Sequence, residues 1–185
     1  MQDNYLQALK NNQNAIEAIA ISSLDANKKY VDSRFVNLKF VNSDSLIFFS
    51  NYESNKAAQF NSNKEVMVSA LLYWNTINTQ IRMRGLISEC DKNFSDGYFI
   101  NRNSKKNALA ISSQQSKKIN SYNDVVSNYN FSLENSDLLK RPKYWGGYQI
   151  KPSYFEFWQG DQFRLNKRDV FEMKDNEWNH FILQP

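Results

Sequence analysis

The chain is poor in the residues that build disulfides and metal sites. Its 185 residues include one cysteine, Cys90, and one histidine, His180. A single cysteine excludes an internal disulfide and a thiol-rich metal site. The first residues lack a basic start followed by an apolar run, and no window is apolar enough to span a membrane. We therefore expect a cytoplasmic protein with no signal peptide and no membrane partner.

The chain also has only a small excess of positive over negative charge. The formal net charge is +4, from 23 Lys and Arg against 19 Asp and Glu. This excess permits an anionic ligand, but it is too small and too scattered to indicate a nucleic-acid partner. The chain has no internal repeat or linker, and its length suits one core. We expect a single domain over residues 1–185, in which residues 1–14 form a polar helix or a mobile N-terminal arm.

Alternating apolar and polar residues predict a mainly antiparallel β protein. Strands are expected at residues 17–24, 33–41, 45–50, 65–74, 79–90, 148–159, 169–173 and 178–183. We expect a short helix over residues 54–63, capped by Ser54, and helix-like segments over residues 91–129. Strands, a helical insert and further strands indicate an α+β fold, an antiparallel barrel with helices on one side.

The most informative stretch lies near the C-terminus. Residues 156–160 read Glu-Phe-Trp-Gln-Gly, and residues 164–168 read Arg-Leu-Asn-Lys-Arg. These segments place a tryptophan, a glycine turn and two arginines in an aromatic-rich strand region. Such a group can hold a flat, anionic molecule.

Two further groups of cations lie upstream. Arg34 and Lys39 are five residues apart on a predicted strand, so they point to opposite faces unless a bulge or twist intervenes. From these residues alone, a pair of exposed edge charges is the favoured interpretation. Lys56 lies in the first turn of a predicted helix that follows the strand-end hydroxyl of Ser50, where the helix dipole favours a phosphate.

Three polar elements could contact a ring. Tyr98 and Arg102 are four residues apart on a predicted helix and share a face, so they can stack on a ring and clamp its phosphate. Gln80 begins a predicted strand, and its amide can bond donor and acceptor edges of a ring, although an exposed strand glutamine is more common. Gln115-Ser116 reads by itself as the polar end of a helix.

Together and in this order, the segments resemble the pyridoxine/pyridoxamine 5'-phosphate oxidase family. Its members end in E-F-W-Q-G, R-L-H-D-R and L-A-P, and carry R-x-V-L-L-K, F-Y-T-N…R-K, Y-F-x-x-R, K-Q-S-S and W-G-G-[FY] upstream. Residues 145–148 match the last motif, although alone they read as a tight turn between core aromatics. The resemblance runs from about Arg34 to Pro185.

The resemblance implies an FMN-binding split β-barrel that works as a homodimer, with each flavin between two subunits. The cofactor residues that it implies are Arg34, Phe35, Val36, Asn37, Leu38, Lys39, Phe49, Ser50, Lys56, Gln80, Gln115, Ser116, Trp158 and Arg168. The substrate residues that it implies are Lys39, Tyr98, Arg102, Lys106, Arg164, Leu165 and Asn166.

The implied activity is that of an FMN-dependent oxidase in vitamin B6 metabolism. It converts pyridoxine or pyridoxamine 5'-phosphate to pyridoxal 5'-phosphate by hydride transfer to the flavin, and O2 is reduced to hydrogen peroxide. The protein's task is then orientation and electrostatics, so we expect no catalytic side chain and no metal ligand. His180 is expected to be structural or exposed.

Three positions depart from the family pattern. Asn55 stands where the family has arginine, Lys106 where it has serine and Asn166 where it has histidine. Lys106 offers a different donor to a phosphate or indicates another ligand, and Asn166 can hydrogen-bond but cannot carry a proton charge. These departures leave open a related FMN split barrel with another substrate, such as a flavin reductase or a stress-associated flavin-binding protein. A non-enzymatic β-barrel that binds an anionic partner is the second alternative.

Overall fold

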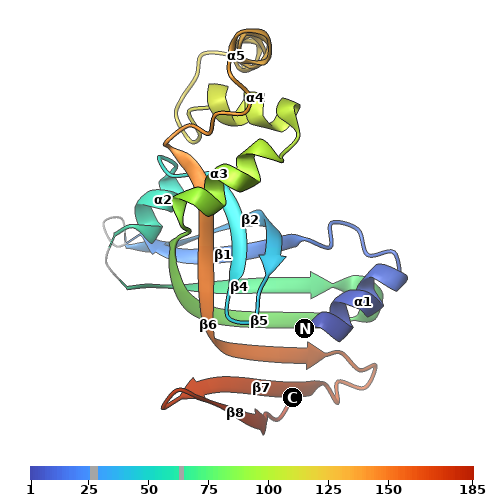
Figure 1. Cartoon of the computed structure of the whole chain (residues 1–185). Coiled ribbons are helices and arrows are strands. Elements are labelled where there is room, and N and C mark those ends of the chain that lie inside the picture. The colour runs from blue at the N-terminus through green and yellow to red at the C-terminus, as the bar shows by residue number, and fades with distance from the viewer. Residues whose placement is uncertain (26–28, 63–64) are drawn as a thin grey trace.

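A computed structural model describes residues 1–25, 29–62 and 65–185. Within these residues an eight-stranded antiparallel sheet has the order β3-β2-β1-β4-β5-β6-β7-β8, and β3 also pairs with β6 (Figure 1). The strands are β1 (Ala18–Asp25), β2 (Tyr30–Val41), β3 (Leu46–Asn51), β4 (Val66–Trp74), β5 (Thr79–Glu89), β6 (Trp145–Gln159), β7 (Lys167–Lys174) and β8 (Glu177–Ile182). Every predicted strand is present, which confirms the antiparallel, mainly β fold.

The long strand β6 has two roles along its length. Its first half pairs with β3 on one side and β5 on the other, and so closes β1 to β6 into a barrel. Its second half pairs with β7, which together with β8 extends the sheet beyond the barrel (Figure 1). The barrel interior is filled by alternate residues of each strand; on β4 these are Val68, Ala70, Leu72 and Trp74.

Most of the helices gather at one end of the barrel (Figure 1). The described helices are α1 (Gln2–Lys10), α2 (Asn55–Phe60), the 3-10 helix η1 (Asn75–Ile77), α3 (Lys92–Ile100), α4 (Ser104–Ser112) and α5 (Tyr122–Asn135). Local sequence explains two of their starts: Asp91 accepts hydrogen bonds from the first N–H groups of α3, and Ser121 with Asp124 forms a capping box on α5. In the described part of the chain, no helix combines the length and the apolar character needed to cross a membrane.

The N-terminal segment forms a helix that packs against the barrel. Ala8 of α1 is fully buried, and the Tyr5 ring meets the Trp74 ring edge-on with centroids 6.1 Å apart. The side chain of Gln13 accepts hydrogen bonds from the backbone N–H and hydroxyl of Thr76. The helix is therefore present; the mobility of residues 1–14 and the single-domain organisation stay predictions.

The predicted boundaries around α2 differ from the structure. This helix ends at Phe60 instead of residue 63, and Asn63 lies outside the described residues. Ser54 occupies the N-cap position, but its hydroxyl donates to the Asn51 carbonyl and makes no capping bond to the helix.

The prediction of a tight turn at residues 145–148 was wrong. These residues begin β6 and pair with Phe48 to Asn51 of β3. No glycine of the described chain has a positive φ, so Gly146 and Gly147 are not needed for a left-handed backbone conformation. A Cβ at Gly146 would lie 2.1 Å from the hydroxyl oxygen of Tyr52, so the missing side chain admits this ring.

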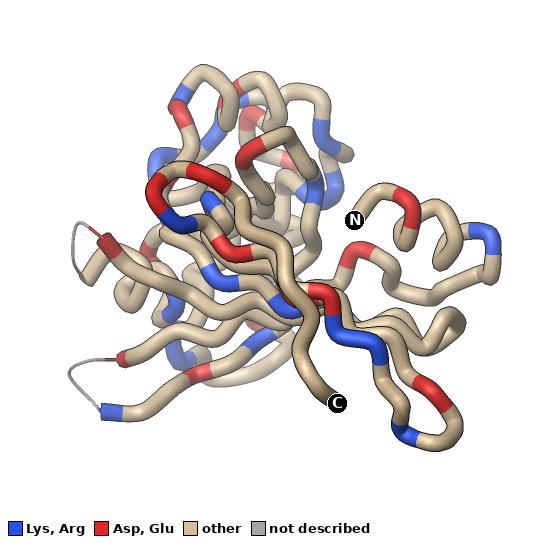
Figure 2. Tube along the Cα trace, turned by 90° about the horizontal axis from the view of Figure 1, so that it is seen from below, with Lys and Arg blue, Asp and Glu red and all other residues tan. Residues whose placement is uncertain are grey.

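Basic and acidic positions are interleaved along the chain trace (Figure 2). The small net charge is thus spread over both signs. Local charge therefore comes from the particular residues that a site brings together.

Gly85 provides a test of the barrel geometry. It lies where the register of β5 against β6 shifts, and a Cβ there would lie 2.3 Å from the Lys151 carbonyl oxygen. Because backbone cannot move aside cheaply, Gly85→Ala should lower the free energy of unfolding by about 2 kcal/mol or more in urea denaturation. Gly97→Ala is the matched control, since nothing lies within 4 Å of a Cβ there on α3. It should raise stability by about 0.5–1 kcal/mol, and equal losses in both variants would contradict the geometry.

Candidate functional site

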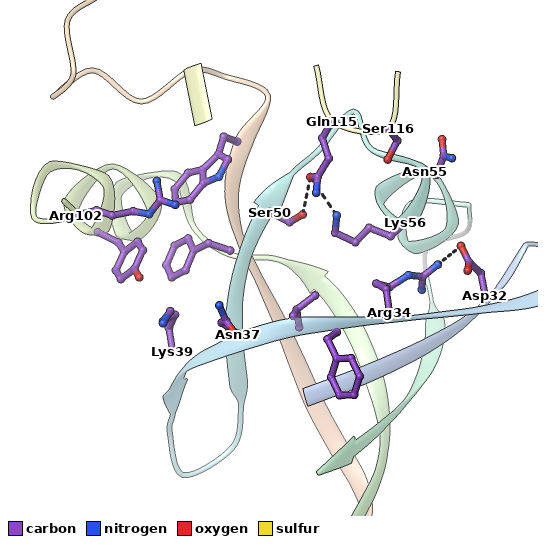
Figure 3. Close-up of a pocket in the computed structure, with 15 residues that line it drawn as sticks. Asp32, Arg34, Asn37, Lys39, Ser50, Asn55, Lys56, Arg102, Gln115 and Ser116 are labelled. Carbon is purple, nitrogen blue, oxygen red and sulfur yellow. Dashed lines mark hydrogen bonds and ion pairs between the residues drawn. The ribbon is translucent and has the colours of Figure 1, made fainter. Parts of the chain in front are cut away.

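A cavity of about 460 Å³ lies among β2, β3, α2, α3 and the loop after α4 (Figure 3). Its lining residues are Asp32, Arg34, Phe35, Val36, Asn37, Lys39, Phe49, Ser50, Asn55, Lys56, Tyr98, Arg102, Gln115, Ser116 and Trp145. Most of the residues proposed for a cofactor or substrate from the sequence are thus brought together from distant segments. Arg34, Asn55 and Lys56 lie at one end, and Lys39 and Arg102 lie at the other (Figure 3).

Arg34 and Lys39 both line the cavity, although they have opposite parity on β2. The pairing of β2 with β3 shifts register between Leu38 and Phe40, which places Lys39 at the irregularity. β2 lies between β3 and β1, so neither cation is on an edge strand; Arg34 is half-buried, whereas Lys39 is exposed. The interpretation as exposed edge charges was therefore wrong for the edge position and for Arg34, and it is right for the exposure of Lys39. Lys39 forms an ion pair with Glu17. Leu38 is 9% exposed and packs in the barrel core instead of lining the cavity.

Lys56 is a buried cation at the first end of the cavity. Its Nζ donates to Ser54 Oγ and to Gln115 Oε1, both at 3.2 Å. Among the described residues it pairs with no carboxylate, and burial together with the charge of Arg34 lowers the pKa of Lys56 to about 8. Ser50 Oγ lies 3.5 Å from the same Gln115 oxygen. A buried, unneutralised ammonium of this kind is stabilised by an anion.

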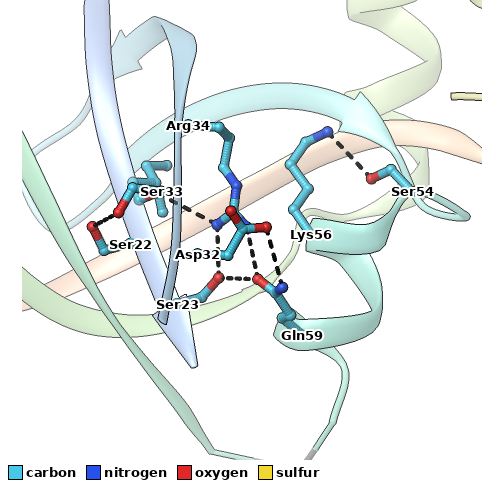
Figure 4. A network of polar contacts seen from close by, with 9 residues as sticks. Ser22, Ser23, Asp32, Ser33, Arg34, Ser54, Lys56 and Gln59 are labelled. Atoms are coloured by element: carbon cyan, nitrogen blue, oxygen red, sulfur yellow. Dashed lines mark hydrogen bonds and ion pairs between the residues drawn. The ribbon is translucent and has the colours of Figure 1, made fainter. Parts of the chain in front are cut away.

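Arg34 is held beside Lys56 by a polar network (Figure 4). Its Nη2 lies 2.5 Å from Asp32 Oδ2 and donates to Gln59 Oε1 at 2.8 Å, while Nη1 donates to Ser23 Oγ at 2.8 Å. Burial opposes the ionised form of Asp32, but the hydrogen bond and charge of Arg34 outweigh it and lower the pKa of that carboxyl. The network fixes the guanidinium between β1, β2 and α2.

Stacked aromatic rings form the wall at the second end. The Phe49 ring lies 3.7 Å from Tyr98 and 5.2 Å from Trp145, measured between centroids, with interplanar angles of 9° and 13°. The Arg102 guanidinium carbon lies 5.0 Å from the Trp145 centroid, and its Nη1 donates to Asn107 Oδ1 at 3.1 Å. Burial lowers the pKa of Arg102. The result is a desolvated, oriented guanidinium beside an aromatic surface.

Lys106 lines a smaller cavity of about 180 Å³ that shares Arg102, Ser50 and Gln115 with the main one. The Arg102 guanidinium also donates to the Lys106 carbonyl at 2.7 Å. The departure at Lys106 therefore lies next to the second end of the site.

The remaining cofactor candidates form a separate row. Gln80, Trp158 and Arg168 are direct partners across β5, β6 and β7, so their side chains share one face of the sheet. None of the three lines the main cavity. One chain thus carries two groups of candidates, one in the cavity and one on the extended part of the sheet.

Arg164, Leu165 and Asn166 lie in the loop between β6 and β7. Leu165 is 74% exposed, and Arg164 adopts a φ of 64°. Asn166 Oδ1 accepts a hydrogen bond from the Asp161 N–H at 3.1 Å and so orders the loop. His180 on β8 is exposed and contacts Asp169.

Three residues that line the cavity were not among the predicted site residues: Asp32, Trp145 and Asn55, which was named only as a departure from the family pattern. Asp32 is two positions from Arg34 on a strand, which places both side chains on one face and was the available signal. Trp145 was assigned to a turn, although its motif was identified. In the described part of the chain, no cluster of three or more His, Cys, Asp or Glu could hold a metal ion.

Comparisons with known proteins identify what the chain is similar to. Residues 145–185 match the family described as the pyridoxine 5'-phosphate oxidase C-terminal dimerisation region. The pyridoxine/pyridoxamine 5'-phosphate oxidase of Legionella pneumophila (strain Lens) is 35% identical over 184 residues, which cover 96% of this chain and 82% of that protein.

Two solved structures share the fold. PhzG from Burkholderia lata 383, in complex with tetrahydrophenazine-1-carboxylic acid, has a TM-score of 0.92 at 23% identity and covers 100% of this chain and 90% of its own. A pyridoxamine 5'-phosphate oxidase-related, FMN-binding protein from Nostoc punctiforme PCC 73102 has a TM-score of 0.80 at 14% identity, covering 99% and 96%. The predicted split barrel is confirmed, and the identity to the Legionella oxidase over nearly the whole chain shows that this chain belongs to the pyridoxine/pyridoxamine 5'-phosphate oxidase family.

Proposed function

We propose that this chain is an FMN-dependent oxidase that converts pyridoxine or pyridoxamine 5'-phosphate to pyridoxal 5'-phosphate, with O2 reduced to hydrogen peroxide. The observation that carries the proposal is the cavity, which holds Arg34 and Lys56 at one end and Tyr98 and Arg102 at the other. Family membership and the FMN-binding neighbour point to FMN as the cofactor. A cytoplasmic location and a single domain belong to the same proposal.

The residues at the first end fit a flavin phosphate. Lys56 is a buried cation without a carboxylate partner among the described residues, and Ser50, Gln115 and Ser116 add neutral polar groups around it. An anion there restores the solvation that burial removes from the ammonium. Asn55 lines the same end and contributes an amide where the family has a guanidinium. When bound, FMN supplies the hydride acceptor for substrate oxidation.

The residues at the second end fit the substrate phosphate. Arg102 is oriented by Asn107 and Trp145, so it can present its guanidinium with little loss of side-chain entropy. Tyr98 and Lys39 face the same space. These groups would anchor the phosphate and so orient the substrate carbon toward the flavin, which is a task of positioning.

We propose that a second subunit completes each site. The row of Gln80, Trp158 and Arg168 and the loop at residues 164–166 would reach the cavity of a homodimer partner. The match of residues 145–185 to a dimerisation region supports this, as does the exposure of Leu165. Apolar side chains that are exposed in one chain are commonly covered by a partner.

The proposal is tested by aerobic turnover of the purified, FMN-loaded protein. Pyridoxine 5'-phosphate should yield pyridoxal 5'-phosphate and hydrogen peroxide in equal amounts, measured by aldehyde absorbance and a peroxidase-coupled assay. Bound flavin without product would favour a relative with another substrate, which the neighbouring Lys106 motivates. Protein that stays colourless after addition of FMN would favour the non-enzymatic alternative.

A further inference from the structure

Glu156 lies directly beside the row of Gln80, Trp158 and Arg168. It is two residues before Trp158 on β6, so both side chains point to the same face of the strand. Its direct partner across β5 is Arg82, and Arg168 is its diagonal neighbour on β7. The side chain of Glu156 is only 2% exposed.

Both carboxylate oxygens of Glu156 are occupied. Arg168 Nε donates to Oε1 at 2.8 Å, while Arg82 Nη1 and the Tyr154 hydroxyl donate to Oε2, each at 2.9 Å. Burial opposes ionisation, but the hydrogen bonds from Arg168 and Tyr154 and the charge of Arg82 outweigh it, so the pKa of Glu156 is lowered. The buried carboxylate is therefore charged at neutral pH and compensated by donors.

Arg168 is held at two points. Besides its bond to Glu156, its Nη1 donates to the Gln184 carbonyl at 3.0 Å. Its Nη2 has no hydrogen-bond partner among the described residues, so this corner of the guanidinium stays available. A guanidinium is planar, and fixing Nε and Nη1 determines where Nη2 points.

We propose that Glu156 is a positioning residue that fixes Arg168 for flavin binding, an inference that rests on the proposed contact between Arg168 and FMN. A buried ion pair contributes little net stability, but its geometry is strict. In this arrangement Glu156 sets the direction of the free Nη2. It also restricts the rotamers of Arg168 before FMN binds, so less side-chain entropy is lost on binding. Glu156 itself does not touch the cofactor.

A double-mutant cycle on FMN affinity tests the proposal. Kd is measured by flavin fluorescence quenching, without substrate, for the full chain and for Glu156→Gln, Arg168→Ala and the double variant. Glu156→Gln should weaken binding by about tenfold when Arg168 is present and by less than about twofold when it is absent. Glu172→Gln is the control, because it removes another carboxylate of β7 that pairs with an arginine of β5, Arg84, and it should leave Kd unchanged.

Three outcomes would overturn the proposal. If Glu156→Gln weakens FMN binding equally with and without Arg168, Glu156 has a purely structural role. If Glu156→Gln does not weaken FMN binding, Glu156 does not position Arg168. If Arg168→Ala leaves Kd unchanged, Arg168 does not contact FMN. If Glu156→Gln does not yield folded protein, Glu156→Asp keeps the charge and draws the carboxylate back by one methylene, and the same comparison applies. Because no substrate is used, failure of the oxidase assay leaves this result unaffected.

Discussion

Lys56→Met should weaken FMN binding by about 100-fold. Lys56 is a buried ammonium whose hydrogen-bond partners in the described chain are neutral oxygens, so the phosphate would be its only full counter-charge in the proposed site. Loss of a charge-assisted bond in such a place costs about 3 kcal/mol, which corresponds to roughly this factor. Methionine keeps the volume of the side chain, so the packing around it should survive. Flavin fluorescence titration of the flavin-free protein measures the effect.

The pH dependence of binding identifies Lys56 more specifically. Burial lowers the pKa of Lys56 to about 8 in the free protein, so its charge is lost as pH rises through this value. FMN affinity should therefore be level near about pH 7, where the phosphate is already a dianion, and should fall above about pH 8. The fall should be absent in Lys56→Met. Lys105→Met is the matched control, because Lys105 is exposed and lines neither cavity.

The titration of Lys56 should affect stability and FMN affinity in opposite directions: as pH rises, stability should increase while FMN affinity falls. The pKa of Lys56 drops on folding from 10.5 to about 8, so the unfolded chain binds more protons between these values. The free energy of unfolding of the flavin-free protein should therefore gain a contribution as pH rises through this window. Lys56→Met should lack that contribution. For binding, the contradicting outcome is an FMN affinity that falls above about pH 8 in the unsubstituted protein and in Lys56→Met alike. In that case a group other than Lys56 titrates.

The sequence predicted the barrel because local pattern decides it. The alternation of Val68, Ala70, Leu72 and Trp74 with polar or exposed neighbours requires one buried face, and β5 repeats this signal. The start of β6 was missed because two glycines usually indicate a turn. Here Gly146 makes room for the Tyr52 ring, which is a tertiary contact with no local signature.

The site was less accessible to sequence reasoning than the fold. Arg34 and Lys39 have opposite parity, yet both line the cavity, and so do Phe35 and Asn37. Helices and loops from distant parts of the chain enclose the cavity around β2, and the pattern of a single strand does not reveal such an arrangement. The resemblance to a family supplied these residues, whereas the residues alone favoured exposed charges. The separation of Arg34 from Arg168 into two groups follows from strand order, which only the assembled sheet defines.

Arg102→Ala should raise the Michaelis constant for pyridoxine 5'-phosphate by about 100-fold, while the Kd for FMN changes by less than about twofold. Arg102 belongs to the second end of the cavity, and its contacts are with Asn107, Lys106 and Trp145. These contacts hold the guanidinium in place before the substrate arrives. Steady-state kinetics with FMN in excess, together with flavin titration, measure the two quantities separately.

The controls decide whether the two ends of the cavity are distinct. Lys105→Ala removes an exposed cation three residues along the chain and should leave both quantities unchanged. Arg102→Lys keeps a charge but not the planar fork, so it should recover only part of the loss if the phosphate is held by two parallel bonds. Loss of flavin in Arg102→Ala would show that this guanidinium serves the cofactor. An unchanged Michaelis constant would show that another cation binds the substrate phosphate. Lys106, in the adjoining cavity, would then be the next residue to replace.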